Sequence, residues 1–356
     1  MDAHRWYELA QEQLGQGQYH EAKDLLQNAL QLEPSFQEAL ADLALVYIHQ
    51  GDFEEALAQY NSLLELDDQI DTRIKQAGIL LYLDRPQEAE QQFLSILQQE
   101  PGNDLAQKGL ADSYFRQNNF KGAQELYDQL LEADDSNAFL WYSKAEAYYR
   151  AQDHEQALLA IEQAIDLQQA PEFFAFKGDF YIRHDNFERA LEQYRLAANL
   201  SPKDPEIRMR LGFILRILQR PKDAIEAFDK ALEFEPDHLE ALENKIEILE
   251  ELQQPAAALA AKEQLVRRHP NNLEAGLELT NYYMQHDGYQ RAAEIFELLI
   301  DEHYDNGEIW LGLAHCLYKE QQYQQALQAV HKAQDYLDDT ISCQELETQI
   351  KTQMKA

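Results

Sequence analysis

Cysteine is nearly absent from this 356-residue sequence, which contains only Cys316 and Cys343 and no C-x-x-C pair. Two isolated thiols cannot form a structural zinc site, a redox motif or a disulfide framework. Both lie on apolar helical stripes, so we expect them to be buried and reduced.

Apolar runs of membrane length are absent as well. No stretch is long enough to span a bilayer, and the N-terminal residues MDAHRWYELAQEQLGQGQ lack the apolar core of a signal peptide. We therefore expect a cytoplasmic protein with no direct membrane insertion.

Basic residues are few, because 30 lysines and arginines face 65 acidic residues and the net charge is -35. Such a chain repels phosphate, so nucleic acids and anionic membranes are not expected partners. The excess of acid either keeps a long exposed surface soluble or attracts basic partners.

Catalytic signatures are also missing. The sequence has no H-E-x-x-H, P-loop, G-x-G-x-x-G or G-x-S-x-G motif, and its eleven histidines are scattered. We expect no enzymatic activity, no metal and no cofactor.

The sequence has instead an alanine that recurs at steps of 33 or 34 residues. The column consists of Ala22, Ala56, Ala89, Ala123, Ala157, Ala190, Ala224, Ala258, Ala292 and Ala326. A fixed period in this range is typical of a solenoid built from one repeated supersecondary unit. The chain is therefore expected to form one continuous array rather than several globular domains.

Each repeat has the pattern of two helices of about a dozen residues joined by a tight turn. All ten prolines fall in turns or at helix starts, where a missing N–H does no harm. The position twelve residues before each alanine is usually Ala or Gly, as at Gly178 and Gly212, which allows close helix contact. An aromatic residue on the second helix, such as Tyr194 or Phe228, fills the next gap.

These features resemble the tetratricopeptide repeat, whose pattern is W-x2-L-G-x2-Y, then A-x3-F, then P. The three tryptophans, Trp6, Trp141 and Trp310, occupy one slot of this pattern, and residues 178–202 match it almost slot for slot. The resemblance covers residues 3–341 as ten repeats. In 239–272, Ile246 replaces the small residue and Lys262 the aromatic, so we expect this repeat to be the weakest joint.

Residues 342–356 are expected to form a C-terminal capping helix. Ser342 and Glu345 fit a capping box, and an apolar stripe faces the preceding repeat. The stripe consists of Cys343, Leu346, Ile350 and Met354.

The resemblance implies an all-α, right-handed superhelical solenoid of antiparallel helix pairs, in which the first helices line a concave groove for peptides or partner helices. Central repeats place an acid four residues before an arginine in the groove-facing columns, so each pair can meet on one helix face. The pairs are Asp112 with Arg116, Glu146 with Arg150, and Asp179 with Arg183. The candidate partner-binding residues are Phe115, Arg116, Phe139, Tyr142, Tyr149, Arg150, Ile182, Arg183, Met209, Phe213 and Arg216. The arginines are either a binding row or only a support for their own helices.

Two further features bear on the partner. The lysine and asparagine set of the carboxylate clamp found in chaperone-binding relatives is not complete in any three successive repeats. Five glutamates on one first helix, Glu240, Glu243, Glu247, Glu250 and Glu251, favour a basic segment or repel wrong partners. The expected function is a non-enzymatic scaffold that holds a protein or peptide in its groove; the alternative is a ligand-gated regulator whose superhelix changes pitch on binding.

The alanine column generates a stability prediction. Ala190→Leu adds bulk at the closest helix contact and should lower the free energy of unfolding by about 1–3 kcal/mol. Thermal melting followed by circular dichroism measures the change. An unchanged melting temperature would show that the repeat register is wrong.

Overall fold

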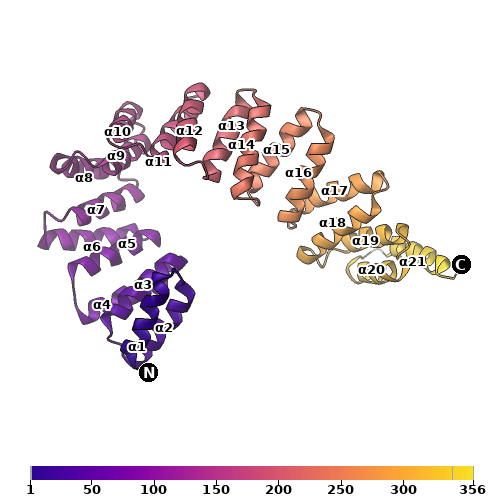
Figure 1. The fold of residues 1–356 in the computed structure, drawn as a ribbon, viewed down its shortest axis with the longest axis horizontal. Helices are drawn as coiled ribbons and strands as arrows, with labels where there is room; N and C mark the ends of the chain where they lie inside the picture. The colour runs from indigo at the N-terminus through magenta and orange to yellow at the C-terminus, as the bar shows by residue number, and fades with distance from the viewer. Residues whose placement is uncertain (1, 339, 356) are drawn as a thin grey trace. The chain divides into compact units, whose positions relative to one another are not determined.

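The computed structural model of the protein describes residues 2–338 and 340–355, and this part of the chain contains 21 α-helices and no strand (Figure 1). The helices belong to two compact units, the first ending at Gln169 and the second beginning at Ala170. Within each unit, every helix packs against the next one along the chain. The expected all-α fold of paired helices is confirmed.

The helices are 13 or 14 residues long throughout the described part of the chain. In the first unit they are α1 (Ala3–Gly15), α2 (Tyr19–Leu32), α3 (Gln37–Gln50), α4 (Phe53–Leu66), α5 (Ile70–Tyr82), α6 (Pro86–Gln99), α7 (Asp104–Arg116), α8 (Phe120–Ala133), α9 (Ala138–Arg150) and α10 (His154–Leu167). In the second unit they are α11 (Pro171–Arg183), α12 (Phe187–Leu200), α13 (Pro205–Ile217), α14 (Pro221–Phe234), α15 (Leu239–Glu251), α16 (Pro255–Arg268), α17 (Leu273–Gln285), α18 (Tyr289–Glu302), α19 (Gly307–Lys319), α20 (Tyr323–Tyr336) and α21 (Ile341–Gln353).

The alanine column lies in the core of both units. Every alanine of the column is 0% exposed except Ala258, which is 4% exposed and belongs to the repeat expected to be the weakest. The small residues twelve positions before each alanine allow close helix contact, as expected. A Cβ atom at Gly178 would lie 2.5 Å from the ring of Tyr194, and one at Gly212 would lie 2.7 Å from the ring of Phe228. Alanine and glycine therefore set how closely the two helices of a repeat approach each other.

Helix α21 packs against α20 and α19 through Cys343, Leu346 and Ile350, all of them buried. The expected capping box is wrong, because the helix begins before Ser342 and its N-cap residue, Thr340, makes no side-chain capping bond. Met354, expected on the buried stripe, is the C-cap residue and is 46% exposed.

The two cysteines are both buried, as expected. Burial raises the pKa of the Cys316 thiol to about 12, with the nearby charge of Glu320 adding to the effect. This thiol is therefore protonated at neutral pH. Among the described residues, no helix combines the length and the apolar character that crossing a membrane requires.

The turn inside each repeat contains a residue in the left-handed region, five positions before the alanine. In the first two repeats it is a glycine, Gly17 or Gly51, but the other eight carry side chains there. These eight residues are Asp84, Asn118, Gln152, Asp185, Gln219, Gln253, Asp287 and Gln321, with φ between 54° and 65°. Asparagine and aspartate tolerate this conformation, whereas a glutamine pays the full steric cost of its Cβ atom.

This turn column generates a second prediction. Gln219→Gly should raise the free energy of unfolding by about 0.5–1 kcal/mol, because relief of the left-handed strain exceeds the added entropy of the unfolded chain. Urea unfolding measures the gain. Gln219→Ala is the matched control, since it removes the same side chain but keeps the Cβ atom, and an equal gain from this control would contradict the explanation.

Candidate partner-binding site

One candidate site is an open cavity in the first unit, with a volume of about 660 Å³. Helices α5, α7 and α9 supply most of its wall. It is lined by Ile74, Gly78, Leu81, Tyr82, Asp84, Phe93, Leu105, Lys108, Gly109, Asp112, Phe115, Arg116, Asn118, Tyr127, Ser143, Glu146 and Arg150.

Two glycines shape this cavity in opposite ways. A Cβ atom at Gly109 would lie 2.2 Å from Cζ of Phe93, so Gly109 lets the ring pack tightly against α7. A Cβ atom at Gly78 would have nothing within 4 Å. Gly78 therefore leaves open a space that a side chain would otherwise occupy.

Three exposed basic side chains, Lys108, Arg116 and Arg150, line the cavity and form no ion pair with any described residue. The guanidinium of Arg150 lies 5.7 Å from the ring centroids of both Phe115 and Phe120, a distance at which the charge is attracted to the aromatic faces. These contacts hold Arg150 at the edge of the cavity with its hydrogen-bond donors available.

The acids of the cavity are held by tyrosines rather than by arginines. The hydroxyl of Tyr127 donates to Asp112 Oδ1 at 2.8 Å, and that of Tyr142 donates to Glu146 Oε1 at 3.2 Å. The expected ion pairs with Arg116 and Arg150 do not form among the described residues, so that interpretation is wrong at these two positions. The aromatic residue four positions after the alanine was expected only to fill space, and the hydrogen bond from its hydroxyl at Tyr127 was not foreseen.

Both carboxyls titrate above their usual range. Burial raises the pKa of Asp112, and the hydrogen bond from Tyr127 and the charges of Lys108 and Arg116 oppose this rise. Burial also raises the pKa of Glu146, and the negative charge of Asp112 adds to the effect. The acids are thus costly to keep ionised, whereas the three cations are exposed.

Of the predicted residues in the first unit, the cavity brings together Phe115, Arg116 and Arg150. Phe139, Tyr142 and Tyr149 do not line it; Phe139 is 43% exposed and Tyr149 packs 5.5 Å from the ring of His154.

Three residues that line the cavity were not among the predicted binding residues. Each occupies the same repeat position as one of the predicted residues, but one repeat earlier. Tyr82, which is 64% exposed, precedes Arg116 by 34 residues, and Leu105 and Lys108 precede Phe139 and Tyr142 by 34 residues each. Following each column toward the N-terminus would have found them.

The remaining predicted residues belong to the second unit, where their roles differ. Arg216 is paired with Glu247 at 2.6 Å and Glu251 at 3.1 Å, and it donates to Asn244 at 2.9 Å. Met209 is only 3% exposed, so its assignment to the binding surface is wrong and it belongs to the core. Ile182 is half-buried, Arg183 is exposed and Phe213 is 37% exposed.

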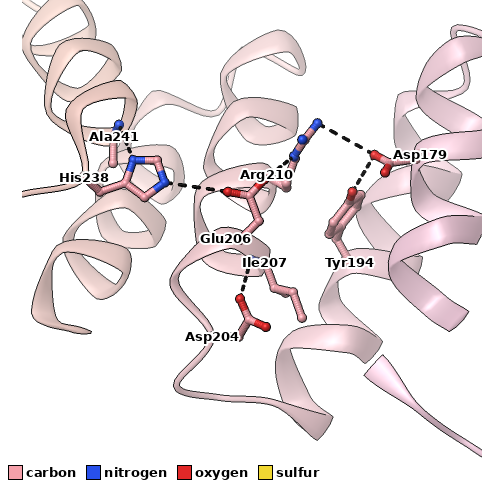
Figure 2. Close-up of polar contacts among 8 residues, drawn as sticks. All are labelled: Asp179, Tyr194, Asp204, Glu206, Ile207, Arg210, His238 and Ala241. Atoms are coloured by element: carbon pink, nitrogen blue, oxygen red, sulfur yellow. Dashed lines mark hydrogen bonds and ion pairs between the residues drawn. The ribbon is translucent and has the colours of Figure 1, made fainter. Parts of the chain in front are cut away.

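A network of polar contacts connects three repeats of the second unit (Figure 2). Tyr194 donates to Asp179 at 2.6 Å, which repeats the tyrosine–aspartate bond of the first unit. Arg210 lies 3.9 Å from Asp179 and donates to Glu206 at 2.8 Å, while His238 lies 3.7 Å from the same glutamate. The charged groups of this surface therefore satisfy one another, unlike the three cations of the cavity.

Among the described residues, no group of three or more His, Cys, Asp or Glu side chains is placed to hold a metal ion.

Two tetratricopeptide repeat family models match the chain. One matches residues 13–77 and 283–350, and the other matches overlapping segments that together extend from 74 to 272. The chain belongs to the tetratricopeptide repeat family. The tetratricopeptide repeats form the overall architecture, and the cavity and the polar network are features of particular repeats.

Several curated proteins are similar to these tetratricopeptide repeats over part of their length. The human protein O-mannosyl-transferase TMTC1 is 26% identical over 227 residues, which cover 62% of this chain and 22% of that protein. DnaJ homolog subfamily C member 3 of Gallus gallus is 22% identical over 308 residues, which cover 67% of this chain and 61% of that protein. The chain thus spans less than two thirds of these relatives.

A crystal structure of a tetratricopeptide repeat protein from Parabacteroides merdae resembles this fold, with a TM-score of 0.57 at 17% identity. The match covers 69% of this chain and 98% of that one. At this identity the likeness shows the fold alone.

The tyrosine–aspartate bond generates a third prediction. Tyr127→Phe should lower the free energy of unfolding by about 1.5–3 kcal/mol at neutral pH, because a half-buried carboxylate loses its donor. The pKa of Asp112 is raised in the folded state, so the folded protein takes up this proton first as the pH falls. The loss should therefore shrink as the pH falls from about 7 toward about 4, the ordinary pKa of an aspartate.

Tyr60→Phe is the matched control for this experiment. Tyr60 occupies the same column and is 3% exposed, but its hydroxyl donates to none of the described residues. Urea unfolding of both variants at the two pH values makes the comparison, and equal losses, or a loss at Tyr127 that does not change with pH, would contradict the role given to Asp112.

Proposed function

We propose that this protein is a non-enzymatic scaffold that binds an acidic segment of a partner protein in the cavity of its first unit. The observation that carries the proposal is the set of three basic side chains around that cavity, none of which has an ion pair in the described residues. They stand out in a chain whose net charge is -35.

The charged groups inside the cavity determine which hydrogen-bonding groups the partner needs. Lys108, Arg116 and Arg150 face the carboxyls of Asp84, Asp112 and Glu146, so the wall is close to neutral. Because tyrosine hydroxyls already satisfy two of the acids, the ammonium and guanidinium groups are the donors that remain. Carboxylates and backbone carbonyls are the acceptors that such groups bind best.

The apolar part of the wall can anchor the same segment. Tyr82, Leu105 and Phe115 line the cavity beside the cations, and Tyr82 and Leu105 are 64% and 65% exposed. A few aromatic and arginine contacts commonly carry most of the energy of an interface. An extended peptide that alternates acidic and apolar residues matches this wall, and the cavity volume is in the range of ligand-binding sites in proteins.

The proposal is tested by titrating a fluorescently labelled peptide of alternating glutamate and leucine into the full chain at physiological ionic strength. Gly78→Leu should weaken binding at least about tenfold, because the new side chain enters the open space without strain in the fold. Arg150→Glu should also weaken binding, with an effect that grows as salt is lowered.

Gly15→Leu is the matched control, since Gly15 is also a helical glycine with nothing within 4 Å of its Cβ position and it lies outside the cavity. Its affinity for the peptide should equal that of the wild type. Unchanged affinity of the glutamate–leucine peptide for Gly78→Leu would rule out this cavity as the site.

A further inference from the structure

A smaller slot opens in the second unit between α16 and α17, next to the C-terminal end of α15. Its volume is about 270 Å³. It is lined by Glu250, Gln253, Gln254, Pro255, Ala258, Leu259, Lys262, Glu278, Leu279 and Tyr282. Apart from the polar rim, the floor consists of apolar side chains.

The slot lies in the repeat that carries a lysine in the column four residues after the alanine. Six of the other repeats carry an aromatic residue there, and the remaining three carry Leu26, Ile161 and Val330. Two of the aromatic rings pack against the first helix of the next repeat, Phe93 at Gly109 and Phe296 at Gly312. The ring of Phe296 is so close that a Cβ atom at Gly312 would lie 2.4 Å from it. In this repeat the corresponding residue is Lys262, which extends to the rim instead of filling the space.

Tyr282 shows that a core position has become part of this opening. It belongs to the column ten residues before the alanine, and the other members of the column in repeats two to ten are at most 8% exposed. These members are Val46, Ile79, Ser113, Ala147, Phe180, Ile214, Ile248 and Cys316. Tyr282 is 40% exposed and lines the slot. His286 stacks on one face of this ring at 4.3 Å, and the rest of the ring is exposed at a position that is otherwise covered.

The rim of the slot is acidic. The ammonium of Lys262 lies 2.8 Å from Glu250 Oε1 and 3.4 Å from Glu278 Oε2, so two carboxylates share one cation. Burial lowers the pKa of Lys262, but the hydrogen bonds and charges of these two glutamates raise it overall. Glu240 and Glu243 extend the negative charge along α15, and neither forms an ion pair with a described residue.

We propose that this slot is a second binding site, which receives one aromatic or leucine side chain from a basic segment of a partner protein. An apolar cavity of about 150 Å³ is enough to bind benzene, so the slot has room for such a side chain. The unbalanced glutamates select basic residues beside it, because opposite charge at the rim favours the right partner and repels acidic ones. The slot thus favours a basic partner segment, whereas the cavity of the first unit favours an acidic one.

The test uses two synthetic peptides that carry a single 4-fluorophenylalanine, one among lysines and serines and the other among glutamates and serines. Binding to the full chain is followed by fluorine NMR, which detects weak association. The lysine peptide should bind, and the glutamate peptide should not bind at this slot. A lysine peptide with alanine in place of the aromatic residue should bind at least about tenfold more weakly, because it leaves the slot empty.

Two variants at one position separate filling of the slot from charge. Lys262→Phe introduces the aromatic residue that six other repeats carry in this column, so it should raise the melting temperature and weaken binding of the lysine peptide at least about tenfold. Lys262→Gln keeps the slot open and releases Glu250 and Glu278, so it should strengthen binding of the same peptide.

Three outcomes would overturn the proposal: no binding of the lysine peptide to the wild type, equal binding to Lys262→Phe, or equal binding of the alanine peptide. A dimer in sedimentation that Lys262→Phe dissolves would replace the basic segment with a second copy of this chain. Because Gly78→Leu lies in the other unit, it should leave binding of the lysine peptide unchanged, so the two sites can fail independently.

Discussion

The close approach of two helices at a small residue is the constraint on which the rest of the structure depends. A single pair of 13- and 14-residue helices cannot bury its apolar face by itself, so each pair must pack against the next. The alanine column makes this possible because its side chains, nearly all of them 0% exposed, leave the helix axes close enough for aromatic rings to fill the remaining space. Where this column carries a lysine instead of an apolar side chain, at Lys262, a slot remains.

Both proposed binding sites lie at departures from the repeat rather than at features that all repeats share. Gly78 leaves a space that another residue would fill, and Lys262 leaves one that an aromatic would fill. Charge then distinguishes the two openings. In the cavity, tyrosine hydroxyls satisfy the acids and leave cations as donors, whereas at the slot a single lysine is shared by two glutamates. The two proposed sites therefore differ in the charge of the partner segment that they favour.

Features that depend on one repeat alone were predictable from the sequence, and features that depend on contacts between helices were not. The helix pairs and the buried alanines follow from local periodicity. The hydrogen bond from Tyr127 to Asp112 depends on how the second helix of the repeat is oriented against the first, which the sequence pattern does not specify. The pairing of Arg216 with Glu247 crosses from one repeat to the next, and the burial of Met209 depends on its neighbours in the same way. Spacing along one helix could not decide these cases.

The central claim is that the first unit holds an acidic partner segment through Lys108, Arg116 and Arg150. Photo-crosslinking tests it most directly, with a benzophenone amino acid placed inside a glutamate–leucine peptide and the attachment sites read by mass spectrometry. The account predicts attachment to α5, α7 and α9, concentrated at Tyr82, Leu105 and Phe115, and loss of these products with Gly78→Leu. Attachment mainly to α15–α17, or spread evenly over both units, would contradict it.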